Sequence, residues 1–229
     1  MKSLSFITFI FCLTIFACNN QANKSYVSQH KDSSVKLNAD SSKTFTNTNS
    51  ESKLFGERLN LTGDFNGDGI KDSIFESYIS GLSGKETFKV LDTTDWENNV
   101  DLVVKNAPIA LFYSNIKNAD TFIVTKEPQQ TGISLMENLG DLNNDKGDEI
   151  GYIINWADNS NLNTYHIISL NKNKKWQELF SFPINESVNY EPELLYKNSS
   201  IISKTGPNKI NYKFYSDSAT VEEGIKIFR

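Results

Sequence analysis

Cysteine and histidine are scarce in this chain, and their scarcity removes several classes of site. The 229 residues contain two cysteines, Cys12 and Cys18, and two histidines, His30 and His166. Zinc centres and thiol-based active sites need such residues gathered in one place. No His-Glu-x-x-His or Gly-x-Ser-x-Gly sequence is present either, so neither a thiol enzyme nor a zinc hydrolase is indicated. His166 lies in a strand-like run and is interpreted as structural.

Long apolar runs and an excess of positive charge are also missing. No segment outside the N-terminus approaches about 18 consecutive apolar residues, so no membrane-spanning helix is expected. Residues 54–229 contain 17 Lys and Arg against 25 Asp and Glu, a net charge of −8. An acidic domain is a poor nucleic-acid binder and a plausible cation binder. Nucleic acid is therefore not an expected partner.

The N-terminus has the layout of a secretory signal peptide. Lys2 precedes an apolar segment over 4–16, and Ala17 stands just before Cys18. Residues 15–18, Ile-Phe-Ala-Cys, resemble the lipobox of bacterial lipoproteins, in which the cysteine is lipidated and the chain is cut before it. This resemblance implies a signal peptide at 1–17 and acylation of Cys18. The alternative is an ordinary signal peptide that contains a cysteine by chance.

Residues 18–53 are predicted to be a lipidated, disordered tether. They are rich in Ser, Asn, Thr and Lys and have no sustained apolar period. No acidic run follows Cys18 of the kind that resembles the surface-export signal of some bacterial lipoproteins. We therefore expect a cell-envelope protein that is anchored by its lipid to the outer membrane and faces the periplasm, with surface exposure as the alternative.

Short runs of β-branched and aromatic residues recur through residues 54–229. Clusters of Gly, Asn, Asp, Ser and Lys separate them, which is typical of strands and turns. The runs are 74–79, 102–104, 109–112, 121–124, 152–156, 165–170, 176–182, 210–215 and 225–228. Hairpin loops are predicted at 81–84 and 171–175, and 95–103 is the best candidate for a short helix. The expected fold is a single all-β domain at 54–229, either an antiparallel sandwich or an irregular propeller-like β domain.

Two acidic loops are the strongest chemical signal. The first acidic loop, 64–72, reads Asp-Phe-Asn-Gly-Asp-Gly-Ile-Lys-Asp, with oxygen-bearing side chains at positions 1, 3, 5 and 9. The second acidic loop, 141–149, reads Asp-Leu-Asn-Asn-Asp-Lys-Gly-Asp-Glu and repeats these positions 77 residues later. Calcium takes roughly six to eight oxygen ligands, which alternate residues of a tight loop can supply. The alternative is a pair of acidic hairpin turns without metal.

Each acidic loop follows a glycine and runs into an apolar strand. This arrangement resembles the calcium loops of FG-GAP/VCBS repeats, the type found in integrin α-subunit propellers, and Phe55-Gly56 precedes the first loop much as the Phe-Gly of that family does. The resemblance implies calcium as the cofactor, and the implied side-chain ligands are Asp64, Asn66, Asp68, Asp72, Asp141, Asn143, Asp145 and Glu149. At position 7, Ile70 and Gly147 are expected to contribute backbone carbonyls, with the Ile70 side chain turned into the core.

Position 6 distinguishes the two loops. Gly69 can take a left-handed backbone conformation freely, whereas Lys146 must adopt it at a cost of about 1 kcal/mol or a little more. The loop at Asp64 is therefore expected to bind calcium more tightly than the loop at Asp141.

Three functions remain open at this level. The first is a membrane-tethered, non-enzymatic binding or interaction module for a protein or glycan ligand. The second is a carbohydrate-active enzyme with an unidentified carboxylate pair, for which an exposed tryptophan beside such a pair would be the sign. The third is a structural envelope protein whose calcium only stabilises the fold. The polar segment 155–161 around Trp156 is where a ligand is expected to bind.

Overall fold

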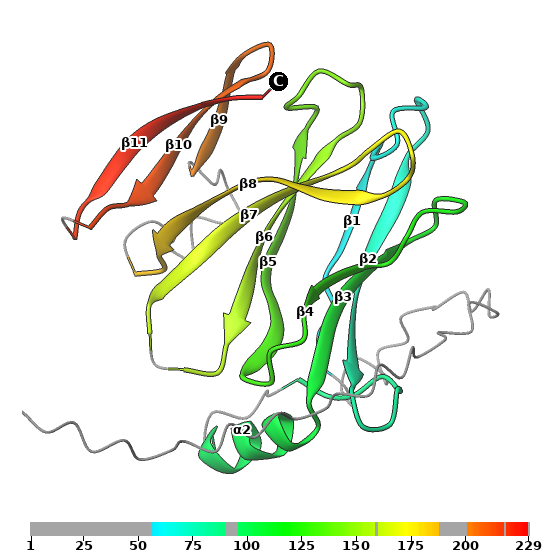
Figure 1. Cartoon of the computed structure of the whole chain (residues 1–229), viewed down its shortest axis with the longest axis vertical. Helices are drawn as coiled ribbons and strands as arrows, with labels where there is room; N and C mark the ends of the chain where they lie inside the picture. Colours follow the sequence, from blue (N-terminus) through cyan, green and yellow to red (C-terminus); the bar gives the residue numbers. More distant parts are fainter. Residues whose placement is uncertain (1–55, 90–95, 159, 188–200, 218, 229) are drawn as a thin grey trace, which may run out of the picture. The chain divides into compact units, whose positions relative to one another are not determined.

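The computed structural model describes residues 56–89, 96–158, 160–187, 201–217 and 219–228 (Figure 1). All of them fall within the compact unit Phe45–Arg229. The predicted signal peptide and tether, including Cys18, lie outside the described residues. Among the described helical residues, none forms a helix long and apolar enough to cross a membrane.

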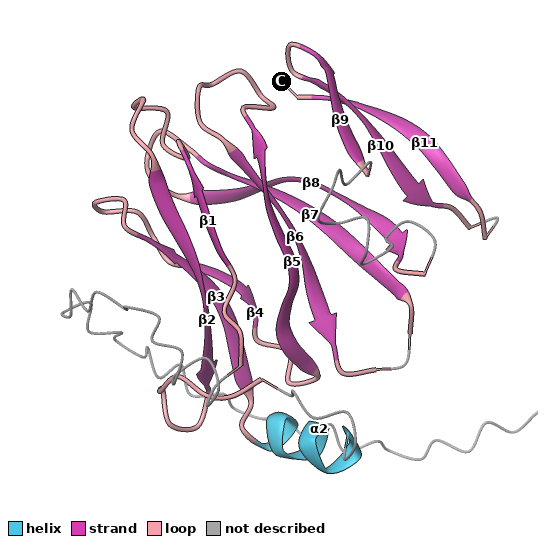
Figure 2. Cartoon of the chain, turned by 180° about the vertical axis from the view of Figure 1, so that it is seen from behind, coloured by secondary structure: helices cyan, strands magenta, loops and turns pink. Residues whose placement is uncertain are grey.

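The described chain forms three antiparallel sheets and one short helix (Figures 1 and 2). Sheet A has the order β1-β2-β3-β4, with β1 Asn60–Gly63, β2 Asp72–Ser80, β3 Pro108–Ser114 and β4 Phe122–Thr125. Sheet B has the order β5-β6-β7-β8, with β5 Gln130–Gly140, β6 Glu149–Trp156, β7 Leu162–Leu170 and β8 Trp176–Asn185. Sheet C has the order β11-β10-β9, with β9 Ile202–Gly206, β10 Lys209–Tyr215 and β11 Val221–Ile227. The helix, α2, is Trp96–Lys105. The predicted all-β, antiparallel fold is confirmed.

Sheet B is the middle layer of the described domain. One of its faces shares a core with sheet A, where Tyr152 of β6 meets Phe112 of β3. The other face shares a core with sheet C, where Ile153 of β6 and Ile210 of β10 are both buried. Successive side chains of a strand point to opposite faces, so β6 is apolar on both sides. The continuous apolar run at 152–154 follows from this double burial.

Sheets A and B repeat one plan. Each is a four-stranded up-and-down meander whose first two strands are joined by one of the acidic loops. The spacing of 77 residues between the loops therefore corresponds to one complete sheet and its connections. Sheet C has three described strands, and a short turn joins β9 to β10. The three open sheets contact one another through two cores, as in the sandwich alternative.

Most predicted elements coincide with observed ones, and the exceptions have local causes. The hairpins at 81–84 and 171–175 are confirmed by short-range bonds, Gly84 N–H to Ser80 O and Lys174 N–H to Asn171 O, both 2.8 Å. The run 102–104 lies in α2, so its interpretation as a strand was wrong and the helix predicted there is correct. β1, β5 and β9 were missed. Register shifts interrupt β5 at three places, so its apolar residues do not alternate regularly.

Candidate metal-binding loops

The first acidic loop joins β1 to β2 and folds around its own oxygen atoms. The two carboxylate oxygens of Asp64 accept hydrogen bonds from the N–H groups of Asp68 and Gly69 at 3.0 and 2.8 Å. Asn66 Oδ1 accepts a bond from Asp68 N–H at 2.9 Å, and Asp68 Oδ1 accepts one from Ile70 N–H at 2.8 Å. The side chains at positions 1, 3 and 5 therefore all turn toward the interior of the loop.

The second acidic loop, between β5 and β6, repeats most of this network. Asp141 Oδ2 accepts a bond from Lys146 N–H at 3.3 Å, as Asp64 does from the residue at position 6. Asn143 Oδ1 accepts a bond from Asp145 N–H, and Asp145 Oδ1 accepts one from Gly147 N–H, both at 2.9 Å. Loops that differ at positions 2, 4, 6, 7, 8 and 9 thus share three of their internal hydrogen bonds, whereas Asp141 Oδ1 accepts from Asn144 N–H at position 4 and Asp64 Oδ1 from Asp68 N–H at position 5.

The backbone dihedrals of the two loops agree as well. At position 6, φ is 85° for Gly69 and 84° for Lys146. At position 4, φ is 71° for Gly67 and 62° for Asn144. The prediction that Lys146 must adopt the left-handed conformation is confirmed. A β-carbon in this region crowds the neighbouring carbonyl, so the second loop holds strain that the first avoids.

Asp72 brings a buried carboxylate to position 9 of the first loop. Its side chain is 7% exposed, it accepts hydrogen bonds from the backbone N–H groups of Phe65 and Asn66, and its Oδ2 atom has no hydrogen-bond partner. Burial raises the pKa of Asp72, and the charge of Asp68 raises it further. A buried carboxylate oxygen without a partner is destabilising unless a proton or a cation compensates its charge.

Glu149 occupies the same position in the second loop and is fully buried. Its carboxylate accepts hydrogen bonds from Leu142 N–H and, at 2.9 Å, from Asn143 Nδ2. Burial raises the pKa of Glu149 to about 7. In both loops, therefore, the ligand predicted at position 9 is held by the backbone at position 2 in a setting that disfavours an uncompensated negative charge.

The side chain at position 7 does not reach the core. Ile70 is 69% exposed, so the expectation that it turns inward was wrong. It follows the left-handed turn at Gly69, on the outer side of the loop. The loops are anchored instead by position 2: Phe65 is buried in the core between sheets A and B, and Leu142 in the core between sheets B and C.

The two acidic loops touch each other and also bind the neighbouring sheets. The carbonyl of Asp64 accepts a hydrogen bond from Asp148 N–H at 2.8 Å, and Asp64 N–H donates to Asp148 Oδ2 at 3.0 Å. In the second loop the equivalent carbonyl, that of Asp141, accepts a bond from the ammonium group of Lys204 on β9. The carbonyl of Asp64 thus links sheet A to the second loop, and the carbonyl of Asp141 links sheet B to sheet C.

The donor atoms suit a hard cation, although the described side chains are not gathered around a common point. No group of three or more Asp, Glu, His or Cys side chains in the described residues is close enough to hold a metal ion. Asn143 Nδ2 instead bridges Asp145 Oδ2 and Glu149 Oε1 at 3.1 and 2.9 Å. Carboxylate, amide and backbone oxygens are the ligands that calcium prefers, and each has lone pairs to spare. Binding would therefore require small side-chain movements around a backbone that is already folded.

Tryptophan and histidine have structural surroundings. Trp156 and Trp176 are half-buried and pack against the core between sheets A and B, and Trp176 Nε1 donates to Asp120 O at 2.9 Å. The side chain of Trp96 lies outside the described residues. The His166 ring stacks on Tyr152 at a centroid distance of 4.8 Å, and its Nδ1 lies 2.9 Å from Glu178 Oε2. The interpretation of His166 as structural is consistent with these contacts.

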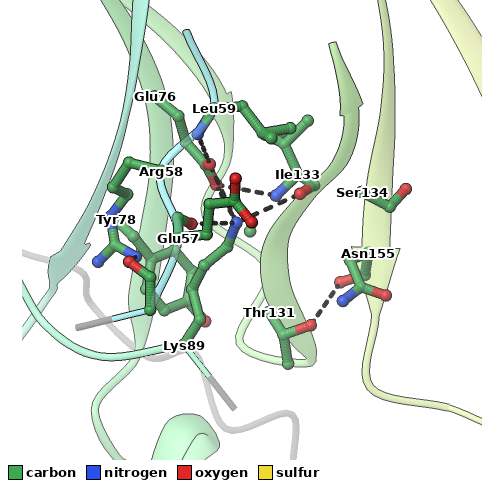
Figure 3. Close-up of polar contacts among 12 residues, drawn as sticks. Glu57, Arg58, Leu59, Glu76, Tyr78, Lys89, Thr131, Ile133, Ser134 and Asn155 are labelled. Atoms are coloured by element: carbon green, nitrogen blue, oxygen red, sulfur yellow. Dashed lines mark hydrogen bonds and ion pairs between the residues drawn. The ribbon is translucent and has the colours of Figure 1, made fainter. Parts of the chain in front are cut away.

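A buried ion pair between sheets A and B was missed at the sequence level (Figure 3). Lys89 Nζ lies 2.8 Å from Glu76 Oε1 and donates to Ile133 O on β5 at 3.2 Å. The Glu76 carboxylate also accepts the N–H groups of Leu59 and Ile133, each at 3.0 Å. A charged residue at an inward-facing position, between Ile74 and Tyr78, was the signal that could have revealed it. The Lys89 ammonium and the Glu76 carboxylate neutralise each other, and both bond to Ile133 of β5. The ion pair therefore holds sheet A against sheet B.

Comparisons with protein-family models, curated proteins and solved structures find no match to this chain. The resemblance to FG-GAP/VCBS repeats therefore depends on the two acidic loops alone. Any functional conclusion about this chain therefore depends on the geometry of those loops.

Proposed function

We propose that this chain is an exported lipoprotein, tethered through Cys18, whose β domain binds calcium in the two acidic loops and acts as a binding module. One observation supports the calcium sites above all others. Two loops at equivalent places in two sheets share three hydrogen bonds from backbone N–H groups to side-chain oxygens, and both have left-handed residues at positions 4 and 6, one of which is a lysine. Lys146 takes this conformation at an energetic cost, so the contacts of the loop impose the same backbone shape on a residue that disfavours it.

The role of the cation in this proposal is to compensate the negative charge of the loops. Each loop places three carboxylates on one short segment: Asp64, Asp68 and Asp72 in the first, and Asp141, Asp145 and Glu149 in the second. Within each loop these carboxylates repel one another. The carboxylates at position 9, Asp72 and Glu149, are buried, so little water screens their charge. Calcium would offset this repulsion and supply the partner that Asp72 Oδ2 lacks. Because the loops join the three sheets, the cation would stabilise the whole domain.

A cleft beside the second loop favours the binding module over a purely structural protein. Its volume is about 670 Å³, and its lining includes Asn143, Asp145, Gln177, Leu179, Lys226 and Phe228. Two of these residues are predicted calcium ligands, so metal binding would set the charge and shape of one wall. The segment 155–161, where we expected a ligand, does not line this cleft. The occupant of the cleft in this proposal is a protein or glycan segment.

Calorimetric titration and thermal melting test the calcium sites. Calcium should bind the purified full chain and raise its melting temperature, because a ligand specific to the folded state stabilises it by mass action. Asp64→Ala combined with Asp68→Ala should remove the first site. Asp101→Ala, an exposed carboxylate on α2, is the matched control and should change nothing. If chelator leaves the melting of the wild-type protein unchanged, the proposal is wrong.

The anchor is tested separately. Cys18→Ser should give an exported protein that no longer sediments with membranes and takes up no labelled palmitate, because no described helix can span the bilayer. Continued labelling or sedimentation of the variant would refute the tether and leave the calcium sites untouched.

A further inference from the structure

β11 is a long edge strand that contains neither a bulge nor a proline. In the described part of the chain, no strand pairs with its outer edge, and its pairing with β10 is regular over all seven residues. The two edges of sheet B are interrupted: β5 by three register shifts, and β8 by a register shift and by Pro183. Bulges and proline both discourage pairing with another chain. The remaining edges, β1, β4 and β9, are only four or five residues long.

The outward face of β11 is mostly apolar, with Glu223 between Val221 and Ile225. Ile225 and Ile227 are each 61% exposed, and Val221 is also exposed. The alternate residues Glu222, Gly224 and Lys226 lie on the other face of the strand, where the Lys226 ammonium lies 4.7 Å from the centre of the Phe180 ring of β8. Large aliphatic side chains gathered on one exposed strand mark a surface that is normally covered.

The sequence of β11, Val-Glu-Glu-Gly-Ile-Lys-Ile, is complementary to itself in the antiparallel sense. With Gly224 opposite Gly224 of a second copy, Glu222 lies opposite Lys226 and Val221 lies opposite Ile227. Each of these pairs occurs twice, and no like charges are opposed. A shift of two residues in one direction places Glu223 opposite itself, and a shift in the other places Lys226 opposite Gly224. Of these registers only the central one pairs unlike charges without opposing like charges, although it also places Glu223 opposite Ile225.

We propose that two copies of this chain associate through β11, antiparallel about a two-fold axis at Gly224. The interface is isologous, as in most homodimers, and joins the two C sheets into one six-stranded sheet. Main-chain hydrogen bonds along the edge supply the pairing, and the unlike charges at both ends fix its register. The lipid anchor takes no part in this dimer, and Lys226 of the interface also lines the cleft beside the second acidic loop.

Sedimentation equilibrium of the full chain, in a detergent matched to the density of the buffer, tests this dimer. Wild-type protein should sediment as a dimer. Glu222→Lys or Lys226→Glu alone should weaken association about tenfold, which is about 1.4 kcal/mol, because each opposes like charges twice per dimer. The double variant Glu222→Lys with Lys226→Glu should restore wild-type association. Lys172→Glu, in the exposed β7–β8 loop, is the matched charge reversal that should have no effect.

Cysteine cross-linking gives a readout that does not depend on charge reversal. In the proposed register Glu223 of one copy lies opposite Ile225 of the other, so Glu223→Cys with Ile225→Cys should yield a covalent dimer on mild oxidation. Thermal melting shows whether each variant is folded. A monomeric wild-type protein at the highest soluble concentration, a dimer indifferent to both single reversals, or a folded double-cysteine variant that stays uncrosslinked would each overturn the proposal.

Discussion

At the scale of single residues, position 6 of the acidic loops allows a direct comparison, because Gly69 and Lys146 have nearly the same positive φ. Lys146→Gly should stabilise the protein by about 1 kcal/mol and tighten calcium binding at the second loop. Gly69→Ala should cost a similar amount, and an added β-carbon there meets no atom within 4 Å, so only the backbone conformation changes. Denaturant unfolding and calorimetric titration measure the two effects.

Gly206→Ala is the matched control for this pair. The space around Gly206 is equally open, and its φ lies outside the left-handed region, so its replacement should be nearly neutral. If Gly69→Ala is as neutral as Gly206→Ala, or if Lys146→Gly leaves the second site no tighter, the prediction that backbone strain weakens calcium binding at the second loop is wrong.

Glu149 provides a prediction about pH. Burial raises the pKa of Glu149 to about 7 from an ordinary 4.5, so the folded chain binds this proton more strongly than the unfolded chain does. In chelator, the contribution of Glu149 to stability should therefore be greatest below pH 4.5 and fall as the pH rises from about 4.5 to about 7. Glu149→Gln should flatten most of this slope, measured by denaturant unfolding at several pH values. The pKa of Asp72 is also raised, so a smaller slope of the same sign should remain.

Glu178→Gln should retain the full slope, because that carboxylate is largely exposed. A slope that persists in Glu149→Gln and disappears in Glu178→Gln would show that the titrating group had been misassigned.

Local spacing determined how much of the site could be predicted at the residue scale. The positions of oxygen side chains and of glycine within nine residues predicted the left-handed conformation of Lys146, because hydrogen bonds inside the loop impose it. The exposure of Ile70 could not be predicted in this way, since it depends on where the core lies relative to the loop. The pair of Lys89 and Glu76 was missed because Lys89 follows no strand pattern, and its partners come from three segments.

At the scale of elements, that buried ion pair predicts how firmly sheets A and B are joined. Lys89→Met should destabilise the protein by about 3–5 kcal/mol, because it leaves Glu76 charged and buried beside two N–H donors. Adding Glu76→Gln should recover part of the loss, since the uncompensated charge is removed. Denaturant unfolding of both variants gives the two free energies.

The pair of His166 and Glu178 supplies the comparison for an exposed contact. Glu178→Gln should cost no more than about 1 kcal/mol, because surface ion pairs are screened by water. An equally small loss of unfolding free energy for Lys89→Met would mean that water reaches Glu76 and that the ion pair contributes little to holding the two sheets together.

Prediction of the elements succeeded where both faces of a strand are buried or where its residues alternate cleanly, as in β6 and β2. It failed for β5, whose bulges break the alternation, and for the short strands β1 and β9. These strands are held by pairing with longer neighbours, which a short window of sequence does not reveal. The residues of α2 satisfied both a strand-like run and a helical pattern, and the helix prevailed.

At the scale of the whole molecule, the stack of three sheets could not be predicted from the sequence, although the repetition of the acidic loop could. The spacing of 77 residues marks two copies of one plan. Which face of each meander meets its neighbour depends on long-range contacts, such as that of Tyr78 Oη with the carbonyl of Gln130 on β5. Knowing the stack changes the interpretation of the acidic loops, because they lie where one sheet is linked to the next.

The last prediction concerns what calcium removal does to this stack. Asp64 links sheet A to the second loop through its backbone N–H and carbonyl, and Asp141 links sheet B to β9 through its carbonyl. Chelation should therefore speed amide hydrogen exchange in β1, β2, β5 and β6, including the N–H of Asp148, and leave α2 unchanged as an internal control. With calcium present, Asp64→Ala combined with Asp68→Ala should speed amide exchange only where sheets A and B meet. The replaced side chains take no part in the contacts between the loops, so faster exchange there would come from the loss of the first calcium site. Faster exchange confined to residues 64–72 and 141–149 would show that the cation orders the loops without bracing the sheets. A uniform rise across all elements would mean that the domain opens as one unit.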